Sequence, residues 1–258
     1  MADKKVIAVV GATGAQGGGL ARAILADAGG AFAVRALTRN PSSDKARKLA
    51  AQGAVVVEAD IRDEARLTEA FDGAHGAFLV TDFWEHMSPE QEKQDAATMA
   101  RAAKNAGLRH VIWSTLDDTR AHRAQDGRLV LALPMADGKL AGIAAEDIGK
   151  TAYGIFKRGD ELVGHSVSIA GEHLTGAQMA AHLSKALGEQ VTYVPVPFDA
   201  MRAQPFPAAA EIGNMFQFYA QVPQFVADRD LDVVRGLNPQ LQDFEQWLAA
   251  HKTDLAGI

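Results

Sequence analysis

The sequence predicts an α/β fold in which a Rossmann-like, doubly wound parallel sheet is followed by a smaller C-terminal α+β lobe. Three observations predict it. Short apolar runs alternate with helical patterns through the first half, a glycine-rich turn follows the first apolar run, and this rhythm ends after Asp118. We expect the Rossmann domain over residues 1–120 and the lobe over 121–258, some segments of which are free to return to the Rossmann core.

Five strands are predicted in the first half, each a short apolar run bounded by turn or polar residues. They cover Val6–Val10, Ala33–Arg39, Ala54–Asp60, Gly76–Asp82 and His110–Thr115. Helical patterns lie between them at about 17–28, 43–52, 64–72 and 89–106. Because crossovers between parallel strands are right-handed, these units are expected to form one doubly wound sheet.

The second half mixes shorter elements. Helices are predicted at Glu146–Phe156 and Thr175–Leu187, before an aromatic-rich tail. Three short strands are predicted at Leu129–Leu133, Ser166–Ala170 and Val191–Pro195. This mixture is typical of a smaller α+β lobe.

Composition excludes several classes of protein. The chain has 258 residues, 48% of them hydrophobic and 22% charged, which is enough apolar mass for a real core. A net charge of −6 without a basic stripe gives no footprint for nucleic acid. No stretch approaches the roughly 20 apolar residues that cross a bilayer, so no membrane partner is expected. The absence of cysteine fits a reducing compartment, and we expect the cytoplasm.

A glycine-rich turn carries the main functional signal. Gly11, Gly14 and Gly17 follow a predicted strand and open a predicted helix. Glycines let the backbone approach a pyrophosphate closely, and the amides and dipole of a helix N-terminus favour negative charge. Thr13 and Gln16 can add side-chain donors. The motif therefore indicates a dinucleotide site; the alternative is a tight turn that needs glycine for packing only.

The end of the second strand indicates which dinucleotide. Arg39 stands where an acidic residue would bond the ribose 2′-hydroxyl of NAD. An arginine fork pairs well with a 2′-phosphate, so NADP(H) is favoured over NAD(H); the alternative is a solvated arginine beside Pro41. Asp60 could accept from the adenine amine, with Ile61 against the ring. A surface helix cap is the alternative for Asp60, since both it and Asp63 precede a helix.

With these residues read, the sequence resembles the NmrA-like family of atypical short-chain dehydrogenase/reductases and is most similar to its NADPH-sensing branch. The resemblance implies a Rossmann domain that binds NADP(H), a smaller C-terminal lobe and a regulatory role in which occupancy sets a contact with a protein partner or a second copy. The stretches that carry it are GATGAQGG, LTRNPSS, AQGAVVVEADIRD, GAFLVTDFWE, AAKNAGLRHVIWST, LPMADGKLAGIAAEDIG and the tail from GNMFQFY to LNPQLQDFEQWLAAH.

The resemblance also implies which residues contact the cofactor. The last group of these follows the fourth strand, where switch-point geometry independently favours a ligand because ligands lie at the carboxyl ends of parallel strands. The aromatic pair Phe83 and Trp84 could roof the nicotinamide or belong to the core. The implied contacts are Gly11, Ala12, Thr13, Gly14, Ala15, Gln16, Gly17, Arg39, Asp60, Ile61, Thr81, Asp82 and Phe83.

The sequence departs from the family after Thr115. Family members continue with a helix and a further strand before the LPMAD stretch, whereas here about ten polar residues connect Asp118 to GRLVLALPM. Either the protein is shortened or a stretch is missing from this sequence. In a shortened protein, the fifth strand would become an uncovered edge unless a partner or the second lobe protects it.

Catalysis stays open at this point. Tyr153 and Lys157 have the spacing of the tyrosine and lysine that short-chain dehydrogenases use for proton transfer. Their place after EDIGK makes them more typical of a helix face than of a catalytic pair. Ser114 is expected to be a satisfied hydroxyl, and the histidines lack metal-ligand spacing. Gly149-Lys150-Thr151 lacks the earlier glycine of a phosphate-binding loop, because Ala144 stands there.

Two functions of different class follow, and a third reading stands beside them. The leading hypothesis is an NADP(H)-binding, cofactor-sensing regulator without a catalytic Tyr-x-x-x-Lys pair. The alternative is an NADPH-dependent reductase of a small carbonyl or quinone, in which the cofactor supplies the hydride. The third is a scaffold whose glycine turn no longer binds a nucleotide.

Overall fold

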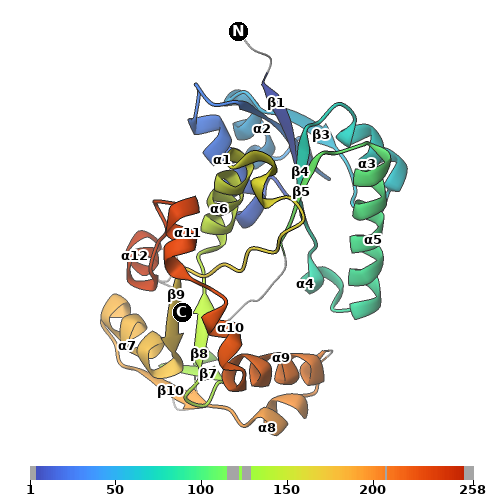
Figure 1. The fold of residues 1–258 in the computed structure, drawn as a ribbon. Helices are drawn as coiled ribbons and strands as arrows, with labels where there is room; N and C mark the ends of the chain where they lie inside the picture. The colour runs from blue at the N-terminus through green and yellow to red at the C-terminus, as the bar shows by residue number, and fades with distance from the viewer. Residues whose placement is uncertain (1–3, 115–121, 124–128, 207, 253–258) are drawn as a thin grey trace. The chain divides into compact units, whose positions relative to one another are not determined.

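The computed structural model describes residues 4–114, 122–123, 129–206 and 208–252 (Figure 1). Within these ranges the chain forms two compact units. The first contains Met1–Leu116 and Ala145–Ser166, and the second contains Asp117–Ala144 and Val167–Ile258, as far as these stretches are described. The sequence expectation of a return to the Rossmann core therefore concerns residues 145–166.

The first unit is built on a five-stranded parallel sheet with strand order β3-β2-β1-β4-β5. Ile7 on the central strand lies between Val34 of β2 and Gly76 of β4, which fixes the register. The predicted Rossmann-like α/β fold is confirmed, and each predicted strand ends within two residues of an observed one. The strands are β1 (Lys5–Val9), β2 (Phe32–Thr38), β3 (Val55–Glu58), β4 (Gly76–Val80) and β5 (His110–Ser114).

Helices cover both faces of this sheet. On one face, apolar side chains of α1, α2 and α6 pack in a buried cluster that includes Leu20, Leu49 and Phe156. On the other, α3 and α5 contribute Leu67 and Met99 to a second cluster. These helices are α1 (Ala15–Ala26), α2 (Asp44–Ala51), α3 (Glu64–Phe71), α5 (Pro89–Asn105) and α6 (Ala145–Lys157), and two short elements accompany them, α4 (Phe83–His86) and the 3₁₀ turn η1 (Gly159–Leu162).

Three helices of this unit begin with ordinary capping chemistry. Ser43, Asp63 and Ser88 each accept a hydrogen bond from a backbone amide in the first turn of α2, α3 and α5. In contrast, α1 has Gly14 as its N-cap and no side-chain cap. The first turn of α1 thus lacks the side-chain acceptor that α2, α3 and α5 have.

Strand β5 lies at one edge of the described sheet. On one side of it, Val111 is 42% exposed and Trp113 is 38% exposed, whereas His110 and Ser114 on the other side are buried. The expectation that the fifth strand forms an edge is confirmed within the described residues. The stretch after it, where the sequence departs from the family, lies outside those residues.

The second unit has two small sheets, one ordered β10-β7-β6 and one formed by β8 and β9. Strands β7 and β10 run parallel and match the predicted strands Leu129–Leu133 and Val191–Pro195. The strand predicted at Ser166–Ala170 is wrong: the chain pairs only from Glu172, where β9 joins β8. The remaining strands are β6 (His122–Arg123), β8 (Lys139–Gly142) and β9 (Glu172–Thr175).

Helices around β7 enclose the core of the second unit. Leu131, Leu183, Phe216, Phe225 and Leu248 pack in one buried cluster. The aromatic-rich tail of the sequence supplies much of this core, since three of these side chains lie beyond residue 208. The helices are α7 (Gly176–Leu187), α8 (Phe198–Arg202), α9 (Ala209–Gln221), α10 (Pro223–Ala227), α11 (Leu231–Leu237) and α12 (Phe244–Ala250).

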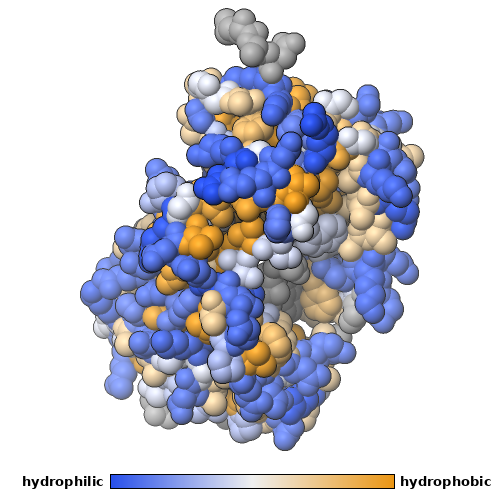
Figure 2. All heavy atoms as spheres, in the orientation of Figure 1, coloured by the Kyte–Doolittle hydropathy of each residue, from blue (hydrophilic) through white to orange (hydrophobic). Residues whose placement is uncertain are grey.

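The surface is mixed in polarity. Hydrophilic residues cover much of the face drawn in Figure 2, and hydrophobic residues are interspersed among them. In the ranges that the structure describes, every helix is too short or too polar to traverse a bilayer.

Candidate functional site

The predicted site residues follow four neighbouring strands at the same edge of the sheet. Because all pairs in this sheet are parallel, the carboxyl ends of β1, β2, β3 and β4 meet at one edge. The strand order reverses at β1, which has β2 on one side and β4 on the other. A crevice outside this reversal point is where open α/β sheets bind ligands.

The glycine turn joins β1 to α1 at the centre of this edge. Gly11 has a φ of +63°, a left-handed conformation that glycine adopts without penalty. A Cβ on Gly17 would lie 2.6 Å from the carbonyl oxygens of Val10 and Gly11, so this position accepts no side chain. Gly14 donates its amide to the Gly11 carbonyl oxygen at 2.9 Å. The turn is therefore tight, and its geometry requires glycine.

The side chains of the turn point in different directions. Ala12 is 1% exposed and its methyl group belongs to the core. Thr13 and Gln16 are half-buried, and Ala15 is exposed. Together with the glycine N-cap, this leaves the backbone amides at the start of α1 without a side-chain acceptor.

Gln16 is tied to the end of β5. The Ser114 hydroxyl donates to Gln16 Oε1 at 2.6 Å, and Ser114 is buried. The expectation that Ser114 is a satisfied hydroxyl is confirmed. Its bond also orients the Gln16 amide group, which leaves the Nε2 donor for another acceptor.

Arg39 is paired with a carboxylate that the sequence analysis does not identify. Its Nη1 lies 2.6 Å from Glu85 Oε1, and Glu85 is part of α4 after β4. The hydrogen bond and charge of Glu85 raise the pKa of Arg39, with smaller contributions from Asp60 and Asp82. The same hydrogen bond to Arg39 lowers the pKa of Glu85. The site thus places one guanidinium near three carboxylates.

Asp60 and Ile61 lie after β3. Asp60 Oδ1 accepts from the Arg62 amide at 2.9 Å, which is an Asx-type turn, while the neighbouring Asp63 caps α3. Ile61 is half-buried and packs against the core formed with α3 and α5. Of the two acids offered as helix caps, only Asp63 is the N-cap.

Thr81 begins a polar cluster that runs from the sheet edge into α5. Its hydroxyl donates to Glu92 Oε1, and Glu92 Oε2 lies 3.5 Å from His86 Nε2. His86 Nε2 also lies 3.8 Å from Asp95 Oδ2, and Asp95 is 2% exposed. His86 Nδ1 accepts from the Ser88 amide at 3.0 Å, so Nε2 is the ring nitrogen that faces the two carboxylates.

Asp82 and Phe83 link β4 to this cluster. Asp82 is exposed and is the N-cap of α4 without capping it by its side chain. The Phe83 ring is half-buried and packs edge-on to His86, with ring centroids 5.9 Å apart. The side chain of Trp84, which the sequence pairs with Phe83, lies outside the described part of the chain.

Tyr153 and Lys157 lie at the other end of α1. The Tyr153 hydroxyl donates to Asp27, the C-cap residue of α1, about 20 Å along the helix from Gly14. Burial, followed by the hydrogen bond and charge of Asp27, raises the pKa of Tyr153 to about 12. Lys157 Nζ lies over the Tyr153 ring, 4.8 Å from its centroid. A phenol with a raised pKa at this place does not resemble a proton donor to a ligand at the sheet edge.

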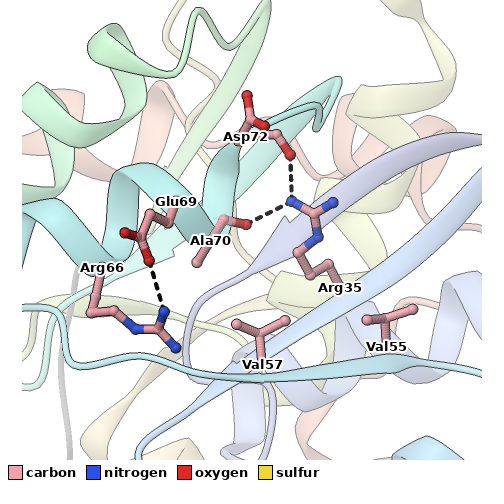
Figure 3. Close-up of a pocket in the computed structure, with 7 residues that line it drawn as sticks. All are labelled: Arg35, Val55, Val57, Arg66, Glu69, Ala70 and Asp72. Carbon is pink, nitrogen blue, oxygen red and sulfur yellow. Dashed lines mark hydrogen bonds and ion pairs between the residues drawn. The ribbon is translucent and has the colours of Figure 1, made fainter.

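A hollow of about 350 Å³ lies elsewhere in the first unit (Figure 3). Arg35 donates to the carbonyl oxygens of Ala70 and Asp72 at 2.8 and 2.6 Å, and Arg66 pairs with Glu69. Arg35 is in the middle of β2, four residues before Arg39, so the hollow is about 13 Å from the predicted edge. Its cations are already bound by acceptors of the chain itself.

Glu85, Glu92 and His86 also belong to this edge, although no sequence motif pointed to them. The sequence does hold a signal for Glu85. Glu85 follows β4 and Arg39 follows β2, and these two strands lie on either side of β1. Opposite charges at the ends of two such strands are close enough to form an ion pair. No comparable pattern marks Glu92, since its contact depends on how α5 packs. Among the described residues, no three His, Asp or Glu side chains are grouped to hold a metal ion.

Comparison with known proteins gives matches along the whole chain. A model of the NmrA-like family matches residues 3–129 and 117–248. An NmrA-like family domain-containing oxidoreductase of Aspergillus japonicus is 39% identical over 114 residues, which cover 43% of this chain and 34% of that protein. The chain thus spans about a third of the length of this curated relative.

Solved structures share the fold. Nmra, a negative transcriptional regulator solved in complex with NADP and with NAD, has a TM-score of 0.77 and 22% identity, covering 99% of this chain and 98% of that one. An NADPH-dependent quinone oxidoreductase from Escherichia coli, complexed with NADPH, has a TM-score of 0.68 and 22% identity, covering 97% and 100%. At these identities the likeness concerns the fold alone.

Proposed function

The chain belongs to the NmrA-like family, and on that premise we propose that it binds NADP(H) and that dinucleotide occupancy sets its association with another protein. The observation that carries the proposal is the start of α1. There a glycine N-cap leaves the first amides of the helix without a side-chain acceptor, while other helices of the same unit are capped. Such amides, with the helix dipole, are suited to a diphosphate.

The residues present fit a dinucleotide. The diphosphate would lie on the turn from Gly11 to Gly17, against the first amides of α1, which have no side-chain acceptor. Asp60 and Ile61 would face the adenine, and Thr81, Asp82 and Phe83 would face the part of the cofactor at the end of β4. The complexes of the regulator and of the quinone oxidoreductase with dinucleotides support this assignment.

Arg39 favours NADP(H) over NAD(H) in this proposal. Its guanidinium follows β2, the position from which doubly wound folds read the adenine ribose. A planar guanidinium forms charge-assisted, bidentate hydrogen bonds with a phosphate. Since the regulator has been solved with both NADP and NAD, the preference has to be measured for this chain.

The test is a calorimetric titration of the wild type and an Arg39→Gln variant with NADPH and with NADH. We expect the variant to lose about tenfold or more in NADPH affinity, as for loss of a charged hydrogen-bond partner, with NADH affinity nearly unchanged. Equal losses for the two cofactors would contradict the assignment of Arg39 to the 2′-phosphate.

A regulatory role is favoured by the surroundings of Tyr153. In the one Tyr-x-x-x-Lys sequence of the chain, the Tyr153 hydroxyl donates to Asp27, and Lys157 lies over the face of the Tyr153 ring. Both contacts lie at the end of α1 that is opposite the glycine turn. Coupling between occupancy and association requires that NADPH bind one association state more tightly than the other. Sedimentation velocity with and without saturating NADPH tests this for a second copy of the chain. An identical association constant in both conditions would argue against coupling to self-association.

A reductase is the second candidate, and the name of the relative favours it. The protein of Aspergillus japonicus that matches 114 residues of this chain is described as an oxidoreductase. In that role the bound cofactor would supply a hydride, and the chain would orient it and the acceptor at the sheet edge. Steady oxidation of NADPH with any member of a panel of quinones and aldehydes would establish the reductase.

A further inference from the structure

We propose that Glu85 is a cofactor-specificity residue that competes with the 2′-phosphate of NADP(H) for Arg39, and that this exchange releases α4 from the end of β2. The inference rests on the proposed function, since it takes Arg39 as the phosphate-binding residue. Beyond that function, the inference makes Glu85 a residue that lowers the affinity for NADP(H), and α4 a segment whose contacts depend on which dinucleotide is bound.

The contact itself is direct. Glu85 Oε1 lies 2.6 Å from Arg39 Nη1, which is a charge-assisted hydrogen bond. It joins the segment after β4 to the end of β2 across β1, because β1 separates these two strands by about 10 Å in all. The carboxylate thus uses a donor that a phosphate on Arg39 would need.

The pair is weak enough to be displaced. The Arg39 side chain is 59% exposed and that of Glu85 is 34% exposed, and ion pairs of this kind contribute little because water and salt screen them. A phosphate has a larger charge and three oxygens that match the guanidinium fork. The 2′-phosphate is therefore expected to replace Glu85 as the partner of Arg39. Breaking the Arg39–Glu85 pair should lower the affinity for NADP(H) only slightly.

The field around Arg39 makes the competition selective. Asp60 and Asp82 also act on Arg39, so a phosphate arriving here meets three carboxylates, and Glu85 is the one in contact with the guanidinium. NADH carries no phosphate at this place and does not need the donor. Neutralising Glu85 should thus favour NADPH and leave NADH unaffected.

Helix α4 is built to respond when Glu85 is released. It has only four residues, and Met87, which follows it, has a φ of +51°, a conformation that residues with side chains rarely adopt. On its other side, His86 Nδ1 accepts from the Ser88 amide, and His86 Nε2 lies 3.5 Å from Glu92 Oε2 and 3.8 Å from Asp95 Oδ2. Loss of the Arg39 contact therefore frees the side of α4 that faces β2, while the connection to α5 holds.

The experiment measures dissociation constants for NADPH and NADH by calorimetry in the wild type, Glu85→Gln, Arg39→Gln and the double variant. We expect Glu85→Gln to tighten NADPH binding roughly two- to five-fold, the range for an exposed ion pair, and to leave NADH unchanged. In the Arg39→Gln background the same substitution should change neither constant. Glu90→Gln, which removes the same charge from the start of α5, is the matched control and should change neither.

A second readout uses the wild type alone. Hydrogen exchange of the α4 amides should be faster with saturating NADPH than with saturating NADH. An unchanged NADPH constant in Glu85→Gln, equal shifts for both cofactors, or α4 exchange that is the same with both would overturn the inference. Failure of the wild type to bind either dinucleotide would instead overturn the proposed function.

Discussion

Tyr153 matches the spacing of a catalytic tyrosine, but its contacts in this structure are those of helix packing. Its hydroxyl donates to Asp27 at the C-terminal end of α1, and its ring carries Lys157 on one face. These contacts fasten α6 to α1 within the first unit. The spacing to Lys157 is one turn of a helix, which brings any two such side chains together irrespective of chemistry.

The raised pKa of Tyr153 gives a pH-dependent prediction. Because its pKa is raised from 10 to about 12 in the folded protein, the protonated phenol stabilises the fold below pH ~10, and this contribution is lost as the pH rises toward about 12. The difference in free energy of unfolding between wild type and Tyr153→Phe should therefore change only above pH ~10, measured by denaturant unfolding at several pH values. NADPH affinity should stay the same. A variant that lost NADPH binding or quinone reduction would show that the phenol belongs to the site.

At this scale the strand pattern predicts which residues lie at the sheet edge, but not which side chains contact each other there. Arg39 and Asp60 could be placed because strand ends in a parallel sheet share one edge, so their position follows from the strand pattern alone. Glu85 pairs with Arg39 through a four-residue helix that has no periodicity to detect. Contacts made by side chains on short irregular segments depend on the packed structure.

Glycines determine how α1 and α6 pack. A Cβ on Gly149 would lie 2.3 Å from the backbone nitrogen of Leu20 and 2.5 Å from the carbonyl oxygen of Gln16. A Cβ on Gly19 would likewise lie 2.5 Å from the carbonyl oxygen of Glu146. The two helices therefore approach backbone to backbone. This packing explains the glycine of the Gly149-Lys150-Thr151 stretch, which does not match a phosphate-binding loop.

Gly149→Ala should consequently destabilise the protein. The added methyl group meets backbone atoms, which cannot move aside as side chains do, so we expect a loss of roughly 1–3 kcal/mol or more in the free energy of unfolding. Gly29→Ala is the control, because a Cβ at Gly29 meets nothing within 4 Å; it should be within about 0.5 kcal/mol of the wild type or more stable. Denaturant unfolding compares the variants. Equal stability of Gly149→Ala and Gly29→Ala would contradict the close helix contact.

Elements with a clear period are predicted well. The five strands of the first sheet and β7 and β10 are short apolar runs between polar turns, and a run of this kind is typical of a buried strand. The error at Ser166–Ala170 has a different cause, because that apolar run has no neighbouring strand to pair with among the described residues. Pairing is a property of two segments, which one segment's pattern does not reveal.

The whole molecule consists of two units with separate cores, and all predicted cofactor contacts belong to the first. Residues 145–166, which follow the polar stretch in the sequence, also belong to the first unit. Sequence patterns could not predict this assignment, because it depends on how closely Gly149 packs against α1. The aromatic-rich tail, by contrast, completes the core of the second unit.

The departure from the family after Thr115 bears on the edge of the first sheet. With β5 at the edge of the described sheet, Val111 and Trp113 expose apolar surface that a further βα unit would cover in a six-stranded doubly wound fold. The predicted cofactor edge at β1, β2 and β4 does not depend on that unit. Dinucleotide binding is therefore expected whether or not the protein is shortened after Thr115.

The account depends most on the amides between β1 and α1. Hydrogen exchange resolved to single amides, with and without saturating NADPH, tests them directly. We predict that exchange slows at the first amides of α1, which have no side-chain acceptor and would gain a bound diphosphate as their acceptor, whereas the amides at the start of α7, which has its own capping box, stay unchanged. Exchange at the first amides of α1 that is the same with and without NADPH would contradict the account.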